Sequence, residues 1–168
     1  KSELLKINGG LDLPIAGKPN QVISSACDSK KIGIIGADYV GLKPTMGVRE
    51  GDCVKKVQIL FSDKKNELAK IVSPISGKVS QINRGARRIL QSVVIDREGD
   101  EEICFEKFTE CSIESTDREK IRNILVESGQ WVELRTRPYS KVPDIRYNPN
   151  SIFVTASDSN PLSANPDV

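Results

Sequence analysis

The sequence predicts an α+β protein that is mainly β, with a β-domain at residues 10–112 followed by the beginning of an α/β domain at residues 113–168. Three observations support this fold class. Short runs of Val and Ile alternate with Gly and Pro over the first two thirds of the chain, a pattern typical of a small barrel or sandwich. Apolar residues then recur at helical spacing near residue 120, and a last apolar run follows near residue 150.

The β-domain is expected to contain several short strands, because β-branched side chains suit a pleated and half-buried surface. The candidate strands are residues 21–23, 31–35, 57–61, 70–72, 78–82, 91–95 and 102–105. An internal similarity at an offset of 60 residues aligns residues 14–35 with residues 74–95. This similarity predicts that the two segments have the same structure, as related halves of one β-domain.

A helix is expected at about residues 117–128, where Thr116 begins a capping-box pattern and Gly129 is a suitable residue just past the end. Residues 131–142 are rich in Arg, Lys and Pro and predict a loop with at most a short helix. Residues 151–155 predict a final strand. The order helix, loop, strand is that of the beginning of an α/β domain.

The composition excludes several classes of function. The 168 residues include 25 basic and 23 acidic side chains, and a net charge of +2 does not favour a nucleic-acid partner. The absence of histidine removes the commonest general base and metal ligand. No apolar run approaches the roughly 18 residues of a membrane span, so the chain is expected to be soluble and to act at a membrane only through another protein.

Four cysteines stand apart from one another, at Cys27, Cys53, Cys104 and Cys111. None belongs to a CxxC pair, which argues against an iron–sulfur cluster or a zinc site. They are interpreted as reduced thiols that pack as small apolar residues.

The middle of the β-domain resembles the biotinyl and lipoyl carrier domains. The resemblance rests on residues 48–56, 58–61 and 73–79. It implies a barrel-sandwich hybrid, a flattened barrel of two interlocked halves. Carriers bear their cofactor on a lysine at a hairpin tip, and Lys64 and Lys65 lie near that place. Because the connection through residues 66–69 is longer than the carriers' turn, a solvated loop is favoured. A carrier modified on Lys64 or Lys65 is the alternative function.

A second resemblance covers nearly the whole chain, in blocks that occur in order and at suitable spacing. The blocks are residues 10–17, 39–46, 82–88, 90–95, 127–131, 134–143, 152–156 and 158–162. They resemble the A-subunit family of the bacterial sodium-translocating NADH:quinone reductase. Members of that family are much longer, so the resemblance implies that this chain corresponds to their N-terminal part.

The resemblance implies a peripheral subunit on the cytoplasmic face of the bacterial inner membrane. Such a subunit docks on the membrane-embedded B-subunit at the quinone end of the complex, and ubiquinone is a further candidate partner. The complex passes electrons from NADH to ubiquinone and exports sodium. Its FAD, FMN, riboflavin and iron–sulfur centres belong to other subunits, so this chain is expected to hold no cofactor and to be non-catalytic alone. A related Rnf-type electron-transport subunit is a further alternative.

A third resemblance concerns residues 117–161, which are similar to the start of the flavin-carrying subunit of the proton-pumping NADH dehydrogenase. In that subunit a Gly-rich loop holds the flavin phosphate through backbone N–H groups. The corresponding residues 134–138 contain no glycine, and their side chains would prevent close backbone approach. The interpretation is a flavin-binding fold that has lost its flavin site.

Two groups of residues are candidates for a partner interface. Arg84, Arg87 and Arg88 form a basic group that suits an acidic partner or a lipid headgroup. The second group mixes arginine with aromatic side chains, a composition enriched in protein–protein contacts. Its members are Trp131, Arg135, Arg137 and Tyr139. No catalytic or metal-binding residue is predicted.

Overall fold

The computed structural model describes residues 14–25, 28–107, 115–156, 158, 160 and 162–164. Contacts divide the chain into two units, one formed by Asp28–Asn148 and the other by the two ends of the chain. The helices and strands of the described residues all belong to the unit Asp28–Asn148. The candidate sites also lie there.

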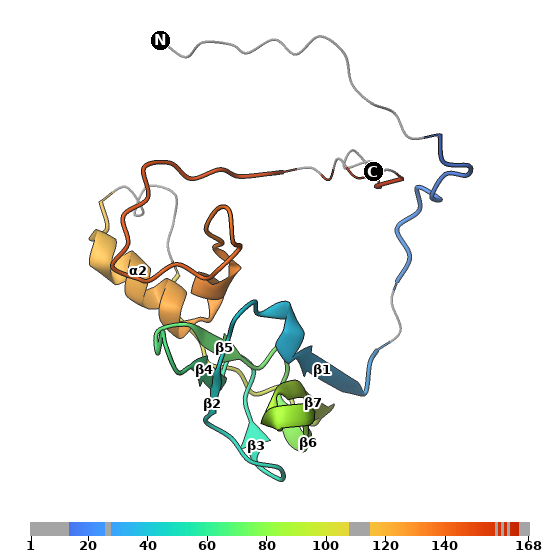
Figure 1. Cartoon of the computed structure of the whole chain (residues 1–168). Coiled ribbons are helices and arrows are strands. Elements are labelled where there is room, and N and C mark those ends of the chain that lie inside the picture. The colour runs from blue at the N-terminus through green and yellow to red at the C-terminus, as the bar shows by residue number, and fades with distance from the viewer. Residues whose placement is uncertain are drawn as a thin grey trace. The chain divides into compact units, whose positions relative to one another are not determined.

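This unit is built mainly from strands. In chain order its elements are β1 (Lys31–Ile35), η1 (Gly36–Asp38), β2 (Pro44–Met46), β3 (Cys53–Val54), β4 (Ile59–Asp63), β5 (Lys70–Val72), β6 (Gly77–Arg84), η2 (Ala86–Arg88), β7 (Leu90–Arg97), α2 (Arg118–Glu127) and η3 (Gln130–Glu133). One antiparallel sheet has the order β1-β7-β6-β3 and the other the order β2-β4-β5 (Figure 1). The arrangement confirms the prediction of a mainly β, α+β protein.

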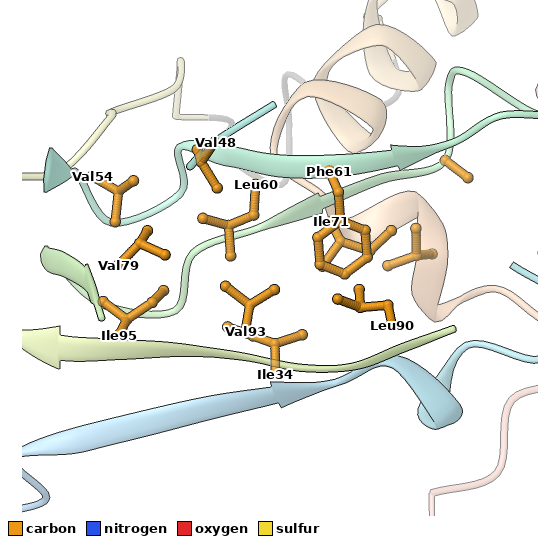
Figure 2. Packing of buried hydrophobic residues seen from close by; sticks show 12 residues of the cluster. Ile34, Val48, Val54, Leu60, Phe61, Ile71, Val79, Leu90, Val93 and Ile95 are labelled. Carbon is orange, nitrogen blue, oxygen red and sulfur yellow. The ribbon is translucent and has the colours of Figure 1, made fainter. Parts of the chain in front are cut away.

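The core lies between the two sheets. Leu60, Phe61 and Ile71 come from the three-stranded sheet, and Val79 and Val93 come from the four-stranded one. Figure 2 shows these side chains pointing toward one another across the interior. All five are at most 2% exposed. Burial of each such side chain contributes about 1.5–3 kcal/mol, so this layer holds the two sheets together.

The helical segment after the barrel packs against β5. The predicted helix at 117–128 is confirmed as α2, and its N-cap is Asp117, one residue after the expected Thr116. Gly129 ends the helix with a φ of +74°, and a Cβ there would lie 2.7 Å from a methyl carbon of Val72. Val132 in η3 is part of the barrel core, and Lys70 forms an ion pair with Glu127. These contacts fix η3 on the barrel.

Two predicted strands at the ends of the chain are wrong. Residues 21–23 and 151–155 have no regular secondary structure. Ile152, Phe153 and Val154 are 71%, 88% and 87% exposed. A strand needs a neighbour for its backbone hydrogen bonds, and no described residue pairs with either segment. Apolar composition alone therefore overpredicted strands here.

Two further predictions about the β-domain are also wrong. The expected strand at 102–105 is reduced to one bridge between Lys56 and Glu102, because no other described residue pairs with this segment. The internal similarity does not produce matching halves, since residues 14–25 are irregular whereas Gly77–Arg84 form the long strand β6. The structural correspondence is limited to the last strand of each copy, since residues 31–35 form β1 and residues 91–95 lie in β7.

Candidate functional site

The predicted basic group occupies the connection between β6 and β7. Within it, the Ile89 N–H donates to the Ala86 carbonyl at 3.2 Å, and Arg87 and Arg88 stand between these residues with φ of +55° and +60°. Two left-handed residues in the centre of a hairpin turn correspond to a type I′ turn, which favours Asn-Gly. Arg84 supports this conformation by donating from Nη1 to the Arg88 carbonyl at 3.2 Å. The turn therefore holds two arginines in a backbone conformation that arginine disfavours.

This turn forms one wall of an open cleft of about 850 Å³. Residues of the segment from Ile35 to Pro44 also line it. Tyr39 lines the cleft and packs edge-on against Phe61 of the core, with ring centroids 6.3 Å apart and an interplanar angle of 87°. Three exposed apolar side chains also line it, Ile35, Val40 and Ile89. The cleft thus has an apolar lining that is connected to the barrel core.

The charged side chains that line the cleft are all cationic. They include five basic residues and no carboxylate. The five are Lys43, Lys64, Arg84, Arg87 and Arg88. None takes part in a salt bridge within the described ranges. The nearby carboxylate of Asp63 instead accepts hydrogen bonds from the backbone N–H groups of Lys43 and Lys65, at 3.0 and 3.3 Å. We call this hollow the cation-rimmed cleft.

Tyr39 links the cleft to the second predicted group. Burial raises the pKa of its phenol, the negative charges of Glu133 and Asp38 raise that pKa further, and the positive charge of Arg135 partly opposes them. The phenol therefore stays protonated at neutral pH and keeps an O–H donor at the cleft. Arg135 acts electrostatically on the same residue that lines the cleft.

The other members of the second group have different environments. Arg137 and Tyr139 are exposed, with Tyr139 at 73%, and Lys141 Nζ lies 5.8 Å from the centre of the Tyr139 ring. Trp131 is only 7% exposed and donates from Nε1 to the Pro143 carbonyl at 2.9 Å. Its ring therefore anchors the loop after η3 and offers almost no surface to a partner.

This tryptophan hydrogen bond gives a test of the loop's attachment. Trp131→Phe keeps an aromatic ring but removes the donor, so the free energy of unfolding should fall by about 0.5–1.5 kcal/mol. Asn66 Nδ2 still reaches the Pro143 carbonyl at 3.3 Å, which limits the loss. Urea unfolding followed by far-ultraviolet circular dichroism measures the change. An unchanged midpoint and slope would mean that the bond contributes nothing to stability.

The candidate carrier lysines are separated by the structure. Lys64 lines the cation-rimmed cleft, whereas Lys65 does not. The loop between β4 and β5 is held down by Asn66, which donates to the Pro143 carbonyl, so it is not a free hairpin tip. Sequence reasoning missed Lys43 as a site residue, because only the pairing of β2 with β4 places it beside Lys64. There the Lys64 N–H donates to the Lys43 carbonyl at 2.8 Å.

No other chemistry is concentrated in the described part of the chain. It contains no group of three acidic or thiol side chains placed to hold a metal ion. Cys53 and Cys104 are exposed, so their prediction as packing residues is wrong, and Cys27 and Cys111 lie outside the described residues. Among the helices that the structure describes, none combines the length and the apolar character needed to cross a membrane.

Comparison with known protein families supports the observed fold and assigns two successive parts of the chain to domains. The family model for the NqrA N-terminal barrel-sandwich hybrid domain matches residues 5–98, which confirms the predicted hybrid fold. The model for the NqrA second alpha/beta domain matches residues 116–168.

Several similar proteins bear the name of the A-subunit of the Na(+)-translocating NADH-quinone reductase. The relative from Vibrio vulnificus is 54% identical over 165 residues, which are 98% of this chain and 37% of the relative. Those from Vibrio anguillarum and Saccharophagus degradans are both 55% identical over the same shares. The chain thus spans little more than a third of the length of these curated relatives. It belongs to the NqrA family, the A-subunits of the sodium-translocating NADH-quinone reductases.

Proposed function

We propose that this chain is part of a peripheral subunit of a sodium-pumping NADH:quinone reductase, and that its role is to dock rather than to catalyse. The observation that carries the proposal is the match of two successive NqrA domains along the chain. The subunit sits on the cytoplasmic face of the bacterial inner membrane, contacts the membrane-embedded B-subunit and works at the quinone end. Ubiquinone is a candidate contact of the whole subunit.

The proposed subunit carries no cofactor on these residues. The loop at 134–138, where a flavin-binding relative would need bare backbone N–H groups, contains no glycine and is followed by the exposed Tyr139. FAD, FMN, riboflavin and iron–sulfur centres would then belong to the other subunits. Arg135, Arg137 and Tyr139 are proposed as contacts to a neighbouring domain or subunit, since exposed arginine and tyrosine are enriched in such contacts.

Deletion of the full-length subunit in its host tests the proposal. We expect NADH-dependent quinone reduction and sodium uptake by inverted membrane vesicles to fall to background, and added full-length subunit to restore both. The full-length subunit purified from its host should show, by intact-mass spectrometry, no biotin or lipoate on Lys64 or Lys65. Undiminished activity without the subunit, or a mass shift on either lysine, would contradict the proposed role.

A further inference from the structure

We propose that the cation-rimmed cleft binds an extended peptide segment, both acidic and apolar, from a neighbouring subunit. This inference rests on the proposed function and deepens it by naming the docking surface and the chemistry of what it receives. The segment would place carboxylates against the basic rim and apolar side chains against the lining.

The charge distribution argues for an acidic partner. Lys43, Lys64, Arg84 at the end of β6 and the two arginines of the hairpin turn stand around one hollow that no carboxylate lines. Clustered like charges repel, so a structure gains nothing by gathering them unless an anion compensates them. Some cations elsewhere in this unit form ion pairs, for example Lys31 with Asp96 at 3.1 Å and Lys55 with Glu101 at 2.9 Å, and the five around the cleft differ in being gathered at one hollow without such a pair among the described residues. The rim of the cleft is therefore a local excess of positive charge that complements carboxylates.

The lining argues for apolar side chains in the same partner. Ile35, Val40 and Ile89 are 51%, 56% and 65% exposed although they lie around one cleft. Single exposed apolar residues are ordinary on a protein surface, but a group of them inside a basic rim is the pattern of an interaction site. A purely ionic ligand such as free phosphate would leave this apolar surface in water.

The strained turn supports a function for the arginines that it holds. Arg87 and Arg88 both have positive φ, in a turn type where Asn-Gly would be relaxed. Disfavoured backbone conformations persist where function requires the side chains that they present. Here that conformation presents two exposed guanidinium groups at the mouth of the cleft.

The edge of the four-stranded sheet favours a peptide over a lipid. β1 is at one end of that sheet's order, and its last residue, Ile35, lines the cleft. The Arg97 N–H donates to the Lys30 carbonyl, so these two residues form a hydrogen-bonded pair of the antiparallel ladder. Because such pairs alternate along the ladder, Ile32 and Ile34 bond to β7. The backbone groups of Lys31, Gly33 and Ile35 therefore point outward. An extended peptide can pair with these groups and continue into the cleft, whereas a lipid headgroup and acyl chain cannot form such a ladder.

Two variants of the full-length subunit with equal charge change test the inference in the assembled complex. R84E/R87E/R88E reverses three rim cations, and R49E/K78E/K107E reverses three exposed cations away from the cleft and from the β1 edge. Each is titrated into membranes from the deletion strain, after circular dichroism has shown that it is folded. We expect the rim variant to need about 30-fold more protein for half-maximal restoration of activity, and the control variant to match the unmodified subunit.

Direct probes identify the occupant. A fluorescent ten-residue peptide of alternating Glu and Val should bind the unmodified subunit and lose its binding to the rim variant, and a Lys-Val peptide should not bind. Binding of phosphatidylglycerol vesicles without binding of the Glu-Val peptide would overturn the inference in favour of a membrane contact. Equal restoration by the rim and control variants would also overturn it while leaving the proposed function intact. Failure of the unmodified subunit to restore activity would instead count against the proposed function.

Discussion

Replacing Phe61 with alanine should lower the free energy of unfolding of the barrel by about 3–5 kcal/mol, a large fraction of the stability of a small domain. Phe61 is 0% exposed and belongs to the layer between the two sheets, beside Ile71 (Figure 2). Its removal forfeits the transfer free energy of the ring and leaves a cavity that neighbours such as Leu60 and Ile71 fill only in part. Urea unfolding followed by the fluorescence of the single, buried Trp131 measures the change.

Replacing Phe61 with alanine should also disturb the position of Tyr39 in the cation-rimmed cleft. Tyr39 rests edge-on against Phe61, so the alanine variant removes the support beneath a residue that lines the cation-rimmed cleft. Phe61→Leu, which retains most of the apolar volume, is the matched control and should cost only about 1–1.5 kcal/mol. A loss below about 1 kcal/mol in the alanine variant would contradict the placement of Phe61 in the core.

The sequence predicted the elements whose signals are local or strongly buried. The Val and Ile runs that became β1, β5, β6 and β7 are compact and alternate in burial, as expected for strands with one face on a core. Helix α2 was predicted because helical spacing and a terminal glycine agree at one place. In each of these elements the local pattern and the tertiary environment favour the same structure.

The failures have a common physical cause. The segments 21–23 and 151–155 have strand composition, but no described residue offers them a partner, and a strand is stable only within a sheet. The internal similarity between 14–35 and 74–95 failed in its first half for the same reason, since residues 14–25 have no strand partner among the described residues whereas Gly77–Arg84 pair with β7. Composition states a preference for extended structure, whereas strand pairing depends on distant residues.

The candidate site was predicted only in part. Arg84, Arg87 and Arg88 are neighbours in sequence, so a basic group was visible without a structure. Lys43 and Lys64 are distant from them and enter the same rim only through the pairing of β2 with β4. Trp131 was predicted at an interface because tryptophan is enriched there, but its ring is used inside the unit. Side-chain type indicates what a residue can do, and burial decides which use applies.

Changing Arg87 to asparagine and Arg88 to glycine should stabilise the protein while weakening its interaction at the cleft. Both positions have positive φ, which costs non-glycine residues roughly 1–2 kcal/mol each and suits the Asn-Gly pair of a type I′ turn. Part of this gain is offset because glycine increases the entropy of the unfolded chain. The net expectation is a gain of about 1–3 kcal/mol, measured by urea unfolding and by an increase of several degrees in Tm.

The double variant also removes two of the five rim cations, so its binding of the acidic Glu-Val peptide should fall. Arg87→Lys with Arg88→Lys is the matched control, because lysine keeps both charges and disfavours positive φ as arginine does. This control should show neither the gain in stability nor more than a small loss of peptide binding. Stabilisation with undiminished peptide binding would show that the strained arginines serve no interaction at the cleft. A loss of stability would instead show that the Arg84 bond to the Arg88 carbonyl and the surrounding turn favour arginine despite its backbone conformation.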